Sequence, residues 1–126
     1  MLTLSLHGRN NFPFRKQHSK IDIEFEDKTG DDEYLSILAG TLPRVFAFEP
    51  EVIFFQSGVD TLVTDRLGRL ALAPAGIRRR NEMVAEACHR YGVPFIVTMG
   101  GGYSDPVERT AEAHASTYIT VRRVFG

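Results

Sequence analysis

Two short, wholly apolar runs with a helix-like stretch between them most constrain how this chain can fold. The runs occupy residues 52–55 and 94–97, and such uninterrupted apolar segments are typical of strands in a parallel sheet that is covered on both faces. Between them, one face of a helix carries the apolar residues Ile77, Val84, Cys88 and Tyr91. Pro74 suits the first helical position and Gly92 suits the end. The pattern predicts a strand–helix–strand unit with parallel strands.

The other segments extend this pattern. Residues 2–6 and 21–25 alternate in polarity like strands, and we expect the second to be an edge strand. Residues 31–46 repeat apolar side chains at helical spacing, but Pro43 should kink this helix or break it into two pieces. A last helix is expected from Asp105 or Pro106 towards Arg123. The predicted fold class is α/β, with a mainly parallel sheet flanked by helices.

Composition narrows the functional classes. The 126 residues are 43% hydrophobic and 25% charged, which is typical of one soluble globular domain. Fifteen basic and sixteen acidic residues leave a formal charge of -1, so net charge gives no reason to expect a nucleic-acid partner. No apolar run reaches the roughly 20 residues of a membrane-spanning helix, and no signal peptide is evident. The single cysteine, Cys88, fits a reducing compartment, so we expect a cytoplasmic protein.

Ligands of parallel α/β sheets bind beyond the carboxyl ends of the strands. Here those ends lead into the loop after Ser5 and Leu6, the loop that contains Asp60, and a glycine run before Tyr103. Asp60 directly follows an apolar strand and Gly58, where a carboxylate can bind a metal or another cation. The alternative is an aspartate that caps a helix or braces the loop, and spacing alone favours that alternative.

The glycine run at residues 100–102 allows a close backbone approach to a ligand, and Tyr103 could donate a hydrogen bond to an oxyanion there. The alternative is a tight turn with a packing tyrosine. We expect residues 78–80, three arginines, to form a solvated helix face, and Cys88 to be a core residue and not a nucleophile. His114 and Glu112 lie on different sides of a helix and cannot face one metal. His18 and His89 are expected to face solvent, and His7, at a strand end, is the only histidine expected near the strand ends.

Taken together, several motifs resemble one known family. In order along the chain they are SGVD at 57–60, DRLGRL at 65–70, PAGI at 74–77 and GGGY at 100–103. SLH at 5–7, NFP at 11–13 and DDEYL at 31–35 add support, so the similarity covers nearly the whole chain. This combination resembles the C-terminal half of the histone deacetylase family, and most of all its class IV and bacterial deacetylase-like members.

The resemblance implies a zinc-dependent amidohydrolase on an arginase/deacetylase-type three-layer fold, which removes acetyl groups from lysine or a similar amine. By this resemblance Asp60 matches a zinc-binding aspartate and Tyr103 the tyrosine that stabilises the oxyanion. The remaining matches concern the substrate tunnel and a structural potassium site. They are Phe12, Leu67, Gly101 and Gly102 for the tunnel, and Ser5 with the carbonyl of Leu6 for the potassium ion.

The chain departs from the family pattern in what it lacks. It contains no Asp-x-His pair for the other two zinc ligands and no His-His pair for proton transfer. Residues 1–126 therefore read as a single partial domain, the C-terminal half of a catalytic domain, that is not expected to hold zinc or to catalyse alone. A missing N-terminal half or self-association should cover its exposed strand edge and helix surface.

Two alternatives to the enzyme interpretation remain open at this stage. One is a non-catalytic α/β interaction module that self-associates through its exposed N-terminal strand. The other is a small phosphate- or nucleotide-binding α/β domain, which rests on the glycine run alone.

Overall fold

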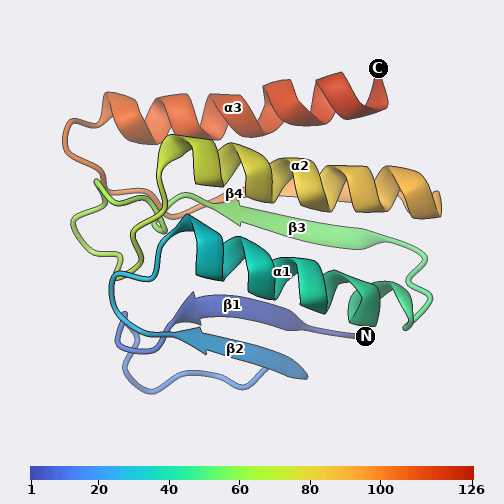
Figure 1. Cartoon of the computed structure of the whole chain (residues 1–126), viewed down its shortest axis with the longest axis horizontal. Helices are drawn as coiled ribbons and strands as arrows, with labels where there is room; N and C mark the ends of the chain where they lie inside the picture. The colour runs from blue at the N-terminus through green and yellow to red at the C-terminus, as the bar shows by residue number, and fades with distance from the viewer.

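A computed structural model describes all residues of the chain, 1–126, as an alternation of parallel strands and helices (Figure 1). No helix is both long and apolar enough to cross a membrane. In chain order the elements are β1 (Leu4–Gly8), β2 (Ile21–Phe25), α1 (Asp31–Phe46), β3 (Ile53–Gly58), α2 (Pro74–Tyr91), β4 (Phe95–Gly100) and α3 (Glu108–Phe125).

The strands are parallel, as predicted, but they form two separate pairs instead of one continuous sheet. β1 pairs with β2, with Leu4 opposite Ile21, and β3 pairs with β4, with Ile53 opposite Phe95. All the strand arrows point the same way in Figure 1, so the loops that follow them gather at one end of the molecule. We call these segments the strand-end loops.

The helices pack side by side, with α2 in contact with both α1 and α3. The start and end predicted for α2 are confirmed: Pro74 lies in its first turn, and Gly92 ends it with a left-handed φ of 66°. Of the two effects predicted for Pro43, a kink in the first helix or a break into two pieces, the break is wrong, because α1 runs on to Phe46. Pro43 lies in the last turn, where its missing N–H removes a single hydrogen bond and its carbonyl still accepts the N–H of Ala47 at 2.9 Å.

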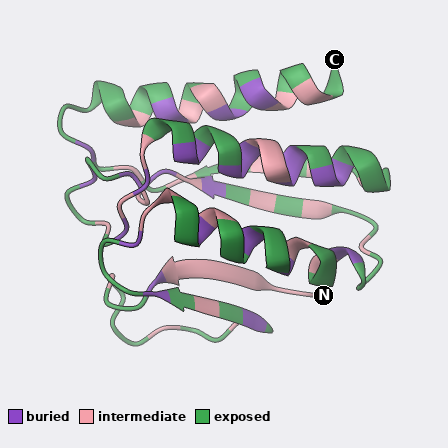
Figure 2. Cartoon of the chain, viewed as in Figure 1, coloured by how far each residue is buried: buried purple, intermediate pink, exposed green.

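Burial alternates from residue to residue along β3 (Figure 2), so the two faces of the β3–β4 pair differ. Phe55 and Phe95 face the core, where Phe95 packs against Phe125 of α3. Phe54 and its partner Ile96 lie on the opposite face and are 69% and 46% exposed. The prediction that both runs are buried on both faces is therefore wrong for this chain, because α2 and α3 cover only one side of the pair.

Candidate functional site

The loops after β3 and β4 meet at Asp60. The N–H of Val59 donates to the carbonyl of Gly100 at 3.2 Å, which continues the strand pairing into the loops. A Cβ on Gly101 would lie only 3.0 Å from the Asp60 Cγ, and the φ of Gly101 is +60°. The close approach and the left-handed backbone both require glycine here. Asp60 therefore lies against the glycine turn that leads into Tyr103.

Asp65 joins the same two loops through its carboxylate. Its Oδ2 accepts the backbone N–H of Tyr103 at 2.6 Å, and its Oδ1 accepts those of Leu67 and Gly68 at 2.9 and 2.7 Å. Gly68 in turn lies against Asp60, whose carbonyl oxygen would be 1.8 Å from a Cβ at that position. Sequence reasoning did not assign this role, although an aspartate followed three residues later by glycine is a recognisable turn signal.

Beneath these loops lies a buried arginine. Arg80 is only 3% exposed; its Nη1 donates to the Gly58 carbonyl at 2.7 Å and its Nη2 to the Ser57 Oγ at 3.1 Å. The predicted solvated face is confirmed for Arg78 and Arg79 but is wrong for Arg80.

Helix periodicity explains the correction. Arg80 follows Ile77 by three residues and precedes Val84 by four, so it lies on the core face of α2 with them. A run of three arginines covers most of a helical turn, and one member of the run must then point inwards.

The arginine belongs to a polar network that links β3, α2 and α3. The Asn81 Oδ1 accepts from the Arg80 Nε and Nη2, each at 3.1 Å, and the Asn81 Nδ2 donates to the Thr117 Oγ1 at 3.0 Å. The Ser57 and Thr117 hydroxyls are 3.1 Å apart. Every member is buried, so the network fixes the end of β3, two residues before Asp60, against both helices.

The surroundings of Asp60 disfavour the negatively charged form of its side chain. Burial raises the pKa of Asp60 above its ordinary value, and the nearby negative charge of Asp65 raises it further. A backbone hydrogen bond and the positive charge of Arg80 act in the opposite direction. Arg80 likewise opposes the rise that burial gives to the pKa of the Tyr34 hydroxyl. A cation next to Asp60 would relieve this cost.

The residues matched to the substrate tunnel lie on the strand-end loops: Phe12 is 82% exposed, Leu67 and Gly101 are exposed, and Gly102 is half-buried. Tyr103, matched to the oxyanion tyrosine, is 53% exposed. Ser5, matched to the potassium site, places its Oγ 2.8 Å from the His7 Nδ1. These positions leave the assigned roles as predictions.

The structure also tests the predictions for Cys88 and for the histidines. Cys88 is buried, and burial raises its thiol pKa to about 11, which confirms a core residue and not a nucleophile. The prediction that His7 alone lies near the strand ends is wrong, because the His114 Nε2 is 3.2 Å from the Gly101 carbonyl oxygen. The fold brings α3 back beneath the glycine turn, which local sequence does not reveal.

The metal-binding groups of this chain do not fit a complete zinc centre. Catalytic zinc takes three protein ligands. No three His, Cys, Asp or Glu side chains of the chain come together as a metal site. This chain can therefore contribute Asp60 as one zinc ligand, but not the other two that a catalytic zinc needs.

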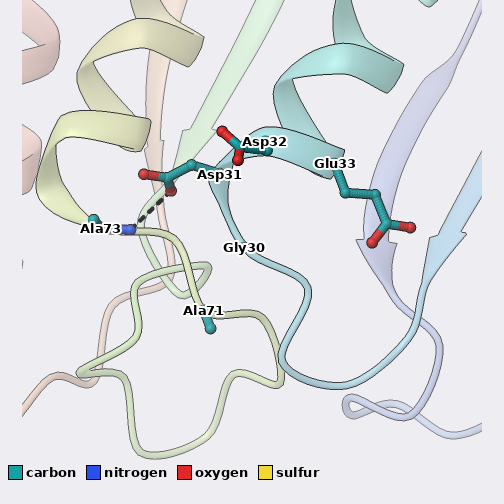
Figure 3. A pocket seen from close by; sticks show the side chains of 6 residues that line it. All are labelled: Gly30, Asp31, Asp32, Glu33, Ala71 and Ala73. Atoms are coloured by element: carbon teal, nitrogen blue, oxygen red, sulfur yellow. Dashed lines mark hydrogen bonds between the residues drawn. The ribbon is translucent and has the colours of Figure 1, made fainter.

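An open hollow elsewhere on the surface has a structural explanation (Figure 3). Acidic residues at the start of α1 and small residues before α2 line it: Gly30, Asp31, Asp32, Glu33, Ala71 and Ala73. The Asp31 Oδ1 accepts the N–H of Ala73 at 2.9 Å, and Gly76 leaves room for that carboxylate. Asp31 thus stabilises the N-terminus of α2, where a negative charge is favourable.

Comparison with known proteins places this arrangement in a family. Residues 1–118 match the histone deacetylase domain. An uncharacterised protein from Picosynechococcus is 36% identical over 126 residues, which are 99% of this chain and 42% of that protein. Histone deacetylase 8 of Xenopus laevis is 30% identical over 105 residues, which are 82% of this chain and 30% of that protein. The chain belongs to the histone deacetylase family and spans less than half the length of these relatives.

Solved structures agree on the fold. An acetylpolyamine aminohydrolase from Burkholderia pseudomallei superposes with a TM-score of 0.79 at 16% identity, over 95% of this chain and 37% of that one. A histone deacetylase homologue from Aquifex aeolicus gives a TM-score of 0.68 at 20% identity, over 98% and 38%. These likenesses confirm the predicted arginase/deacetylase-type α/β fold.

Proposed function

We propose that this chain supplies part of the active site of a zinc-dependent amidohydrolase that removes acetyl groups from lysine or a similar amine. The observation that carries the proposal is the meeting of Asp60 with the glycine turn before Tyr103, at the carboxyl ends of two parallel strands. Membership of the histone deacetylase family supports the reaction class.

In this proposal the site is completed by residues outside the chain. Asp60 is one of three protein ligands of a zinc ion, and the other two ligands and the histidine pair come from elsewhere. The Tyr103 hydroxyl donates a hydrogen bond to the oxygen that becomes negatively charged when the amide carbon turns tetrahedral. Asp65 fixes the backbone of Tyr103, so the phenol is presented from an ordered turn.

The surrounding residues have supporting roles in the same proposal. Phe12, Leu67, Gly101 and Gly102 border the channel that admits the acylated amine. Ser5 and the Leu6 carbonyl contribute to a potassium site behind the zinc.

The completing partner is either the remaining part of a deacetylase domain or a second copy of this chain, in the cytoplasm. Exposed apolar surface supports such an association, because Phe54 and Ile96 lie together on an uncovered strand face. Two-stranded sheets also leave backbone edges open to further pairing. The same surface supports the second candidate function, a non-catalytic module that associates with itself, and that candidate predicts association without acquired activity.

The test is hydrolysis of an acetyl-lysine peptide by the chain alone and by the chain co-produced with the unmatched part of the Picosynechococcus relative. We expect turnover only in the second case. Tyr103→Phe should then lower kcat by about 100-fold or more with little change in KM, because one oxyanion donor is lost. Tyr118→Phe, on the exposed part of α3, is the matched control and should change neither constant. Turnover by the chain alone, or full activity of Tyr103→Phe, would contradict the proposal.

A further inference from the structure

Four of the basic side chains without a carboxylate partner lie on the loops after β1 and β3. Arg15 and Lys16 lie on the loop after β1, and Arg66 and Arg69 lie on the loop after β3. None of the four takes part in an ion pair, although the chain forms such pairs elsewhere, as between Arg109 and Glu112. Lys16 donates only to backbone carbonyls.

The carboxylates near these cations are mostly engaged by other groups. Asp65 accepts three backbone N–H groups, as described above. Glu24 and Glu26 both pair with Arg9, and Asp27 accepts from the Asn10 side chain. Apart from Asp60 itself, Asp105 is the one carboxylate within these loops without such a contact, and Asp32 and Glu33, which line a hollow with Ala71 at the start of α1, are also exposed without an ion pair.

Apolar side chains lie among the unpaired cations. Phe12 and Phe14 are both exposed and meet edge to face, with ring centres 6.5 Å apart. Leu67, which is exposed, lies between the two arginines of the loop after β3. We call these three residues, with Arg15, Lys16, Arg66 and Arg69, the cationic rim.

The cationic rim is joined directly to the candidate site. The backbone N–H of Arg66 donates to the Tyr103 carbonyl at 3.1 Å, and its Nε does so at 3.4 Å. On the other side, a Cβ on Gly8 would lie 3.3 Å from the Arg69 Cβ, so the loop after β1 starts against the loop after β3. A molecule bound at Asp60 and Tyr103 therefore has Arg66 as a near neighbour, and Arg69 follows three residues later on the same loop.

We propose that the cationic rim selects acylated amines that carry carboxylates close to the acylated nitrogen, and rejects polycationic ones. This inference rests on the proposed function of the same site. Arginine binds carboxylate with two parallel hydrogen bonds, and exposed phenyl rings favour an apolar stem beside it. Like charges on the rim and on a polyamine or lysine-rich peptide repel each other, which adds specificity against that class.

Two source molecules share this chemistry: a peptide with acidic residues flanking acetyl-lysine, and a free N-acetylated amino acid. The test measures fluorescence anisotropy of the chain, co-produced with the unmatched part of the Picosynechococcus relative, with two labelled peptides, one with glutamate and one with lysine on both sides of the acetyl-lysine. Nε-acetyl-lysine, which keeps a free carboxylate, and acetylspermidine, which does not, serve as unlabelled competitors. Each peptide is also prepared without its acetyl group.

We expect the glutamate-flanked peptide to bind at least tenfold more tightly than the lysine-flanked one, and the preference to weaken as salt increases. Arg66→Gln combined with Arg69→Gln should reduce the preference about fivefold. Arg66→Lys with Arg69→Lys should retain most of it, because the charge remains. Arg44→Gln with Arg90→Gln removes the same charge from the last turns of α1 and α2 and should leave it unchanged.

The outcomes separate the two levels of the proposal. Equal or tighter binding of the lysine-flanked peptide, or an equal loss in the Arg44 and Arg90 variant, would overturn the rim inference alone. Equal affinity of each peptide with and without its acetyl group would also overturn it, because the peptide would then be bound away from the acyl-binding site. Failure of both acetylated peptides to bind would count against the proposed function itself. If Nε-acetyl-lysine displaces the labelled peptide at a lower concentration than acetylspermidine does, a free N-acetylated amino acid is also supported as a ligand.

Discussion

The loop after β3 and the loop after β1 end at the same side of the molecule but are held in different ways. The first is fixed from inside by Arg80, which donates to the Gly58 carbonyl and to buried side chains, and by Asp65, which accepts backbone N–H groups. The second projects Phe12 and Phe14 into solvent. The difference teaches that the loop segments around Asp60 and Tyr103 are held in place by buried hydrogen bonds, whereas the aromatic surface proposed to meet a ligand is exposed to solvent.

The largest expected effect comes from removing Arg80, the buried cation of α2 that holds the start of the loop after β3. Arg80→Met should lower the free energy of unfolding by about 4 kcal/mol, because the Gly58 carbonyl, the Ser57 hydroxyl and Asn81 lose their buried donor. Urea unfolding measures this change. Arg78→Met, which is exposed on the same helix, should stay within about 0.5 kcal/mol. Equal losses of unfolding free energy in the two variants would show that burial of Arg80 does not fix the loop after β3.

The next effect concerns the carboxylate that joins the two site loops. Asp65→Asn should cost about 2 kcal/mol, because an amide cannot accept from three N–H groups with the strength of a carboxylate. Thermal unfolding and the backbone amide shift of Tyr103 report on it. The exposed Asp105→Asn serves as the control. A Tyr103 amide shift unchanged in Asp65→Asn would show that the contact does not order the turn.

A smaller effect of opposite sign is expected at Asp60. Burial holds its pKa above the ordinary 3.8, so the carboxyl group favours the folded state when protonated. That contribution is complete below the ordinary pKa and is lost as pH rises through the higher folded value. Asp60→Asn should therefore be as stable as the parent or more stable at pH 7, with the gap closing at low pH. A clear loss at pH 7 in urea unfolding would make Asp60 a bracing residue.

The smallest effect belongs to the open loop. Phe12→Ala should change the free energy of unfolding by less than about 0.5 kcal/mol, because the ring is 82% exposed. Phe25→Ala, which empties a buried position against Tyr34, should cost about 3 kcal/mol by the same urea measurement. A large loss in Phe12→Ala would mean that the open loop is packed in solution.

Sequence patterns predicted the order of elements, the parallel pairing and the ends of α2, because these depend on local periodicity and on Pro74 and Gly92. The separation into two strand pairs and the exposure of Phe54 depend on which segments cover a face, and no local pattern encodes that.

The candidate site divides in a similar way. Asp60 and Tyr103 follow strands, so they could be predicted from the tendency of ligands to bind beyond the carboxyl ends of parallel strands. Arg80 was misassigned because neighbouring arginines concealed its helical phase, and His114 reaches the site only through the return of α3. Contacts between distant segments are set by tertiary packing, so the residues that support the site were harder to predict than the residues within it.

The central claim, that Asp60 is one ligand of a metal site completed outside this chain, is tested most directly by zinc content. Elemental analysis of the chain co-produced with the unmatched part of the Picosynechococcus relative should give one zinc per complex for the parent and close to none for Asp60→Asn. The chain alone should retain none after dialysis. One tightly held zinc in the chain alone, or undiminished zinc in the Asp60→Asn complex, would contradict the account.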